Sequence, residues 1–242
     1  MLPRMTEHVT RRTALLALGG LGVLVACGGK RSTTNATPAA TTSTSATSSG
    51  TATASPQRVS CILTPEATEG PFYVAGAPTR RNVTEGQAGT PLALSIVVLD
   101  ATTCQPIKSA DVEIWHANAS GEYSGVQNQT GSDWLRGHQI ADANGLVTFA
   151  TIYPGWYQGR TTHVHVMVHV GGSTVHTGQL FFEDATNAAV FAQGAYASRG
   201  QASDTNAGDS IYGQAGGATA IVPVTKSGSG YAGRINIGVR TT

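Results

Sequence analysis

The sequence has few charged residues and no cluster of one sign. Lys and Arg number 15 and Asp and Glu 14 among 242 residues, so the formal net charge is +1 and charged residues make up only 12%. Without residues 1–26, which hold three arginines and one glutamate, the net charge falls by two, from +1 to −1. A chain with no basic face is not expected to bind nucleic acid.

The apolar run Ala14–Ala26 is too short for a membrane-spanning helix, which needs about 20 residues. It contains three glycines, follows the pair Arg11-Arg12 and ends directly before Cys27. Residues 1–26 are therefore predicted to be a signal peptide of the twin-arginine type. The ending resembles the lipobox of bacterial lipoproteins, which implies lipidation of Cys27 and a location at the bacterial cell surface, anchored to the membrane.

Cysteine is scarce, because only Cys61 and Cys104 follow this leader. In an oxidising exterior such a pair is expected to form a disulfide. The bond would close a loop of about 44 residues and stabilise the fold by about 4 kcal/mol on the chain-entropy model. Two buried free thiols are the alternative.

Residues 27–57 lack the apolar side chains that a folded core requires. After Cys27, they consist almost entirely of Ser, Thr, Ala, Pro and Gly. This composition predicts a disordered tether. The folded domain is expected to span residues 58–242.

The folded part has no long helical period and no internal repeat. Short apolar and β-branched runs are separated by Gly, Asn and Asp, a pattern typical of an antiparallel β-sandwich with long surface loops. The predicted strands are Leu92–Leu99, Val112–His116, Leu146–Ile152, His163–Val170, Val175–Phe182 and Arg234–Val239. A turn or two of helix is expected near Asn187–Gln193, and residues 196–230 are expected to form a long surface excursion.

Two histidines in one predicted strand are the first chemical feature. His163 and His165 are two residues apart, so they point to the same face of the strand and two imidazoles can meet on one metal ion. A pair of histidines packed on a sandwich face is the structural alternative. His138, His169 and His176 are expected to be structural.

Two tyrosines extend this pattern. Tyr123 ends the stretch "VEIWHANASGEY", and Tyr157 ends "TIYPGWY" shortly before the histidines. From about Thr64 to Glu183 the sequence resembles the intradiol ring-cleavage dioxygenases, the family of catechol 1,2- and protocatechuate 3,4-dioxygenases. The resemblance implies one non-haem Fe(3+) ion bound by Tyr123, Tyr157, His163 and His165. Ferric iron is a hard cation that favours anionic oxygen and accepts imidazole.

The resemblance also implies an activity and further site residues. A small aromatic diol would be cleaved between its hydroxyls with O2, giving a muconate-type diacid. Tyr157 would leave the metal and accept a substrate proton, and Arg160 would stabilise charge developing on the ring. Gln179 and Tyr73 would contact the substrate.

Some features depart from the family and leave alternatives open. Only five residues separate Tyr157 from His163, fewer than in the well-known cytoplasmic enzymes, so specificity does not carry over. The helical region through which catechol 1,2-dioxygenases dimerise is missing, so the oligomeric state stays open. One rival is a non-catalytic lipoprotein that binds phenolics or carbohydrate; another is a copper or zinc protein using His163, His165 and His169.

Overall fold

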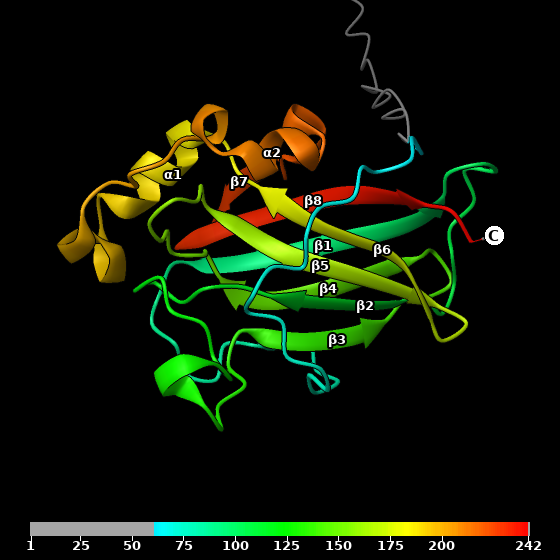
Figure 1. Cartoon of the computed structure of the whole chain (residues 1–242), viewed down its shortest axis with the longest axis horizontal. Coiled ribbons are helices and arrows are strands. Elements are labelled where there is room, and N and C mark those ends of the chain that lie inside the picture. The colour runs from blue at the N-terminus through cyan, green and yellow to red at the C-terminus, as the bar shows by residue number, and fades with distance from the viewer. Residues whose placement is uncertain (1–60, 242) are drawn as a thin grey trace, which may run out of the picture. The chain divides into compact units, whose positions relative to one another are not determined.

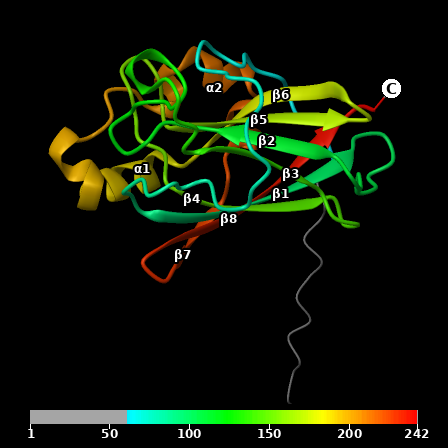
Figure 2. The ribbon, with the colours of Figure 1, turned by 90° about the horizontal axis from the view of Figure 1, so that it is seen from below.

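The computed structural model describes residues 61–241, in which two four-stranded sheets pack face to face as a β-sandwich (Figures 1 and 2). The strands are β1 (Pro91–Asp100), β2 (Asp111–Trp115), β3 (Arg136–Ile140), β4 (Leu146–Ile152), β5 (His163–Val170), β6 (Ser173–Phe181), β7 (Val224–Ser227) and β8 (Gly230–Val239). The helices are α1 (Asp184–Phe191) and α2 (Ser210–Gln214), with short 3₁₀ helices at Gln127–Gln129, Gly194–Arg199, Asn206–Gly208 and Gly217–Ala220. The predicted signal peptide, the lipidated Cys27 and the tether lie outside the described residues.

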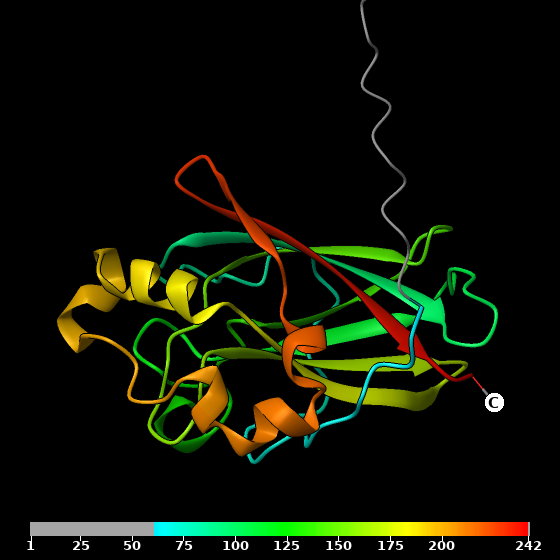
Figure 3. The ribbon, with the colours of Figure 1, turned by 90° about the horizontal axis from the view of Figure 1, so that it is seen from above.

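The strand order is β4-β1-β8-β7 in one sheet and β3-β2-β5-β6 in the other. The predicted sandwich is confirmed, with one addition, because β1 and β8 pair in parallel while the other pairs are antiparallel. No local turn joins these two strands, so no short-range pattern indicates their relative direction. The β7–β8 hairpin projects beyond the sandwich (Figure 3).

The side chains of the sheet β3-β2-β5-β6 alternate between its inner face, which packs on the other sheet, and its outer face. Val164, Val166 and Val168 of β5 point inward and are fully buried against the apolar residues of the facing sheet. Because successive side chains of a strand point to opposite faces, His163 and His165 lie on the outer face. Loops cover this outer face, which explains why both histidines are also buried.

The segment predicted to be a surface excursion, residues 196–230, forms short helices and the strand β7. Several of its side chains are buried, among them Tyr196, Asn206 and Asp209. The helices α1 and α2 lie outside the two sheets, as Figures 1 and 3 show. The segment therefore lies on the surface as expected, but it is folded into short elements and is held there by these buried side chains. Among the described residues, no helix has the length and apolar character needed to cross a membrane.

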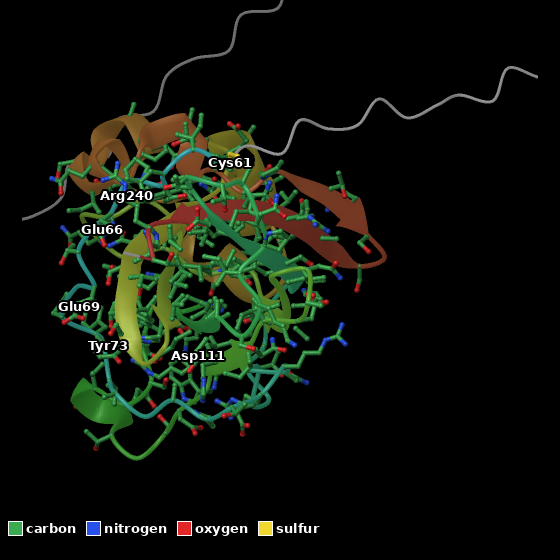
Figure 4. The ribbon with its side chains drawn as sticks, turned by 90° about the vertical axis from the view of Figure 1, so that its right-hand side faces the viewer. Cys61, Glu66, Glu69, Tyr73, Asp111 and Arg240 are labelled. Atoms are coloured by element: carbon green, nitrogen blue, oxygen red, sulfur yellow. A yellow bond between two sulfur atoms is a disulfide. The ribbon has the colours of Figure 1, made fainter. Side chains whose placement is uncertain are left out.

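The predicted disulfide between Cys61 and Cys104 is present, with Cα atoms 5.2 Å apart. It holds the start of a segment that we call the strap, residues 61–73. Figure 4 shows the strap passing from Cys61 by Glu66 and Glu69 to Tyr73. The strap is attached to β6, because the Ala67 amide donates to the carbonyl of Thr177 at 2.9 Å.

We predict that replacing both bridged cysteines with serine lowers the free energy of unfolding by about 4 kcal/mol, because the bond limits the unfolded chain. Urea unfolding of C61S/C104S beside the parent, both in a C27S background, measures the difference. Two free thiols in the denatured, unreduced parent would contradict the bridge.

Candidate metal centre

Three segments bring two tyrosines and two histidines to one place on the outer face of the second sheet. The connection between β2 and β3 carries Tyr123, and the connection between β4 and β5 carries Tyr157. The strand β5 begins with His163, and His165 follows on the same face. The structure thus brings together all four residues that were expected to bind a metal.

The donor atoms of these residues surround one ring nitrogen. Nε2 of His163 lies 3.2 Å from Oη of Tyr157, 3.4 Å from Oη of Tyr123 and 3.2 Å from Nε2 of His165. One ring nitrogen with a single lone pair accepts one good hydrogen bond. Three polar atoms at this distance exceed the one hydrogen bond that Nε2 of His163 can accept. The arrangement suits a cation that binds the lone pairs of all four atoms.

Two glycines allow the tyrosine loops to meet. The amide of Arg160 donates to the carbonyl of Tyr157 at 3.2 Å, and Gly159 stands at φ +83° in this turn, a conformation that favours glycine. Gly155 lies directly against the carbonyl oxygens of Asn118 and Ala119, where a Cβ atom has no room. The loop with Tyr157 therefore packs on the loop that leads to Tyr123.

The surroundings of both histidine rings favour the neutral form, and a hydrogen bond orients the ring of His163. Nδ1 of His163 lies 2.7 Å from the carbonyl of Thr161; a carbonyl only accepts, so Nδ1 carries the proton and Nε2 carries the lone pair. Burial, with the charge of Arg160, lowers the pKa of His163 to about 3. The His165 ring stacks on Trp115 with centroids 4.8 Å apart, and burial together with His163 lowers its pKa strongly.

The two tyrosines differ in exposure. Tyr123 is 4% exposed, whereas Tyr157 is partly exposed. Burial raises the pKa of both phenols, and for Tyr123 the neighbouring Tyr157 adds to the rise. An adjacent cation of high charge reverses such a shift and favours the phenolate.

Arg160 lies beside the tyrosines in a polar network. Its Nη2 donates to Oε1 of Gln179 at 2.5 Å, and its Nε donates to Oδ2 of Asp209 at 2.8 Å. Burial favours a higher pKa for Asp209, but the hydrogen bonds from Arg160 and from the Thr161 amide outweigh burial, so that its pKa is lowered. Sequence reasoning predicted Arg160 and Gln179 and missed Asp209.

Two further residues, Phe72 and Arg199, border the centre, and sequence reasoning missed Arg199. Phe72 of the strap stacks on Tyr123 with ring centroids 4.5 Å apart and meets Tyr157 edge-on at 5.8 Å. Arg199 donates to the carbonyl of Trp156 at 2.6 Å, and its guanidinium lies 4.2 Å from the Trp156 ring centroid. The sequence pointed to Phe72, because residues 68–73 resemble the segment that borders the substrate cavity in the intradiol family, but its stacking on Tyr123 was not predicted.

The remaining predicted residues lie elsewhere. Tyr73, predicted to contact substrate, packs on Trp115 with centroids 5.1 Å apart, one ring removed from His165. His169 lies 3.0 Å from the Thr174 hydroxyl, and His138 is bound by Asp111 and Thr79. His176 is buried. The part of the chain that the structure describes has no group of three or more His, Cys, Asp or Glu residues suited to a metal ion, so tyrosine completes the centre.

The chain matches a known protein family. The family model described as Dioxygenase matches residues 68–215, which include the whole candidate centre. Among curated proteins, a chlorocatechol 1,2-dioxygenase of Pseudomonas sp. strain P51 is 29% identical over 138 residues, covering 48% of this chain and 55% of the relative. A catechol 1,2-dioxygenase of Acinetobacter baylyi is 33% identical over 143 residues, covering 48% and 45%. The chain spans about half the length of the curated relatives it matches.

Solved structures of similar proteins cover more of the chain. An intradiol ring-cleavage dioxygenase from Tetranychus urticae superposes with a TM-score of 0.71 at 32% identity, covering 74% of this chain and 95% of that one. The dioxygenase domain of a dioxygenase–carbohydrate-binding protein fusion from a Streptomyces species has a TM-score of 0.56 at 29% identity, covering 72% and 96%.

Proposed function

The chain belongs to the intradiol ring-cleavage dioxygenases, and from this membership and the geometry of the centre we propose that it is a ferric-iron enzyme which cleaves catechol-type diols with O2 between the two hydroxyls. The products would be muconate-type diacids. The observation that carries the proposal is the convergence of two phenols and two imidazoles on Nε2 of His163, within 3.4 Å.

The donor set fits ferric iron better than other metals. Two phenolates suit a hard, highly charged cation, whereas copper and zinc sites draw mainly on imidazole and thiolate. Tyr123, Tyr157, His163 and His165 would hold the ion. When bound, Fe(3+) supplies a Lewis acid that takes both substrate oxygens and draws electron density from the ring.

The difference in exposure assigns separate roles to the tyrosines. Tyr123, buried under Phe72, would remain a ligand and supply constant negative charge. Tyr157 is partly exposed and lies on a short turn next to Arg160. Its Oη would leave the metal as the diol binds and accept one of the two substrate protons. A hydroxide ion at the site would accept the other and leave as water, so that the charge of the buried site is unchanged.

Arg160 and Gln179 would act on the substrate. The guanidinium of Arg160 is a fixed cation in a poorly solvated site, and such a group stabilises negative charge that develops on the ring. Its charge and hydrogen bond also oppose the rise in the pKa of Tyr157. Gln179, on β6, holds Arg160 through Oε1 and borders the same space. Tyr73 packs in the same cluster as Tyr123 and Tyr157 and stays a proposed substrate contact.

The rival functions have less support. A zinc or copper site of three histidines needs His169 beside His163 and His165, yet His169 lies at the far end of β5, hydrogen-bonded to Thr174. A non-catalytic binding protein has no use for two phenols, two imidazoles and a partly buried guanidinium at one point. Neither rival accounts for the whole set.

We also propose that the enzyme is exported and anchored through a lipid on Cys27. The motif at residues 11–27 supports this location. The Cys61–Cys104 disulfide supports it independently, because such bonds persist in oxidising compartments.

The iron centre predicts a visible colour. Phenolate bound to ferric iron gives a charge-transfer band, so protein purified from iron-replete cells should be red-brown and contain one iron per chain. Metal analysis and an absorption spectrum test this without substrate. A colourless protein containing zinc or copper would refute the ferric site.

Replacing Tyr157 with Phe should lower turnover of catechol by about 10²–10⁴-fold, the range for loss of a general base. Iron should be retained, with a shifted visible band. Replacing Tyr123 with Phe should cause a greater loss of iron and colour, because this ligand remains bound throughout. Oxygen uptake, iron content and spectra are compared, with Y231F as a control that removes a hydroxyl from the core. Near-parental turnover of Y157F would exclude the proposed proton transfer.

A further inference from the structure

Asp209 is a buried carboxylate with no role in the proposed chemistry so far. It precedes α2, within residues 196–230, and its side chain is 1% exposed. A buried charge is costly unless it is paired and hydrogen-bonded. The partners of its two oxygens therefore indicate what this charge does.

The two oxygens have different partners. Oδ1 accepts the Ile211 amide at 2.8 Å, the ordinary role of a residue that caps a helix. Oδ2 accepts two donors from the loop of the metal centre, Nε of Arg160 at 2.8 Å and the amide of Thr161 at 3.0 Å. Capping of α2 needs only Oδ1, so Oδ2 serves the centre.

Thr161 passes this constraint to a proposed metal ligand. Its carbonyl lies 2.7 Å from Nδ1 of His163, the contact that leaves Nε2 with the lone pair. Its hydroxyl donates to Oδ1 of Asn206 at 2.8 Å, and the Asn206 amide group donates to the carbonyl of Phe182 at 2.8 Å. Asp209 and Asn206 thus hold Thr161 at its amide and its hydroxyl, and its carbonyl orients His163.

Arg160 is held at two corners of its planar group. Asp209 accepts from Nε, and Gln179 accepts from Nη2. The orientation of the Gln179 amide is itself determined, because its Nε2 donates to the carbonyl of Thr68 in the strap at 2.9 Å. Two fixed corners determine the plane of a guanidinium. Arg160 is therefore aimed at the tyrosines before substrate arrives.

We infer that Asp209 is a positioning residue, whose single buried oxygen fixes both Arg160 and, through Thr161, the ring of His163. This inference rests on the proposed function, which gives Arg160 its role in turnover. A carboxylate that served only to cap α2 would lower stability when replaced but would show no coupling to Arg160.

The first test needs neither metal nor substrate. The D209N side chain has one oxygen in place of two. This oxygen cannot accept from the Ile211 amide and also from Arg160 Nε and the Thr161 amide. The new side-chain NH2 group therefore faces one of these donors, and a hydrogen bond is lost. In full-length protein from iron-depleted medium, we expect hydrogen exchange at Arg160 Nε–H and the Thr161 amide, measured by NMR, to quicken by about 10-fold or more, as loss of a charge-assisted hydrogen bond implies.

A matched control is D142N. Asp142 likewise accepts two backbone amides, of Asn144 and Leu146, in a turn beyond the far end of β3. This variant should leave exchange at Arg160 and Thr161 unchanged. Unchanged exchange in D209N as well would show that the contacts do not hold the loop, and would overturn the inference.

The second test is a double-mutant cycle on the iron-loaded enzyme. With catechol, D209N should lower kcat by about 10–100-fold with a smaller change in KM, because the fixed guanidinium acts on charge that develops during the reaction. In an R160A background the same change should cost less than about 3-fold, the part that acts through Thr161 and His163, since residues that act as a unit are not additive.

The outcomes separate the two levels of the proposal. Losses that multiply in D209N/R160A would mean that Asp209 does not act through Arg160, and would overturn its positioning role while leaving the dioxygenase intact. Absence of oxygen uptake in the parent enzyme would overturn the proposed function and with it the role of Asp209 in turnover. The exchange experiment does not depend on activity. It gives a negative result only if Asp209 does not bind Arg160 and Thr161 as the structure shows.

Discussion

One ring nitrogen sets the main constraint on this structure. Nε2 of His163 has two phenol oxygens and a second imidazole nitrogen within 3.4 Å, and both imidazoles and Tyr123 are buried. Four atoms with lone pairs gathered this closely repel one another unless a cation lies among them or protons form hydrogen bonds between them. The surroundings are consistent with the cation, because burial keeps both imidazoles neutral and the phenols require a nearby positive charge to ionise.

The sandwich alone does not hold these atoms in place. It supplies the two histidines on the outer face of β5, but the tyrosines lie on loops that need support from distant segments. The strap covers Tyr123 with Phe72 and orients Gln179, while residues 194–214 hold the other side through Arg199 and Asp209. The disulfide fixes the beginning of the strap, so stability and the geometry of the centre are linked.

The sequence was sufficient for the parts that depend on local pattern. Period-two alternation placed His163 and His165 on one face, and the family resemblance identified both tyrosines and Arg160. The strands β3 and β7 were missed because their sequences, RGHQI and VTKS, are polar or short. Asp209 was missed for a different reason: its partners are 48 and 49 residues away, and nothing near it in sequence distinguishes it from a helix cap.

The central claim is that this centre inserts both atoms of O2 into a diol between its hydroxyls. Mass spectrometry of the product formed from catechol under ¹⁸O2 tests it most directly. Intradiol cleavage predicts a muconate-type diacid with one labelled oxygen in each carboxyl group. An extradiol aldehyde product, a quinone without label, or a diacid carrying only one labelled atom would contradict the account.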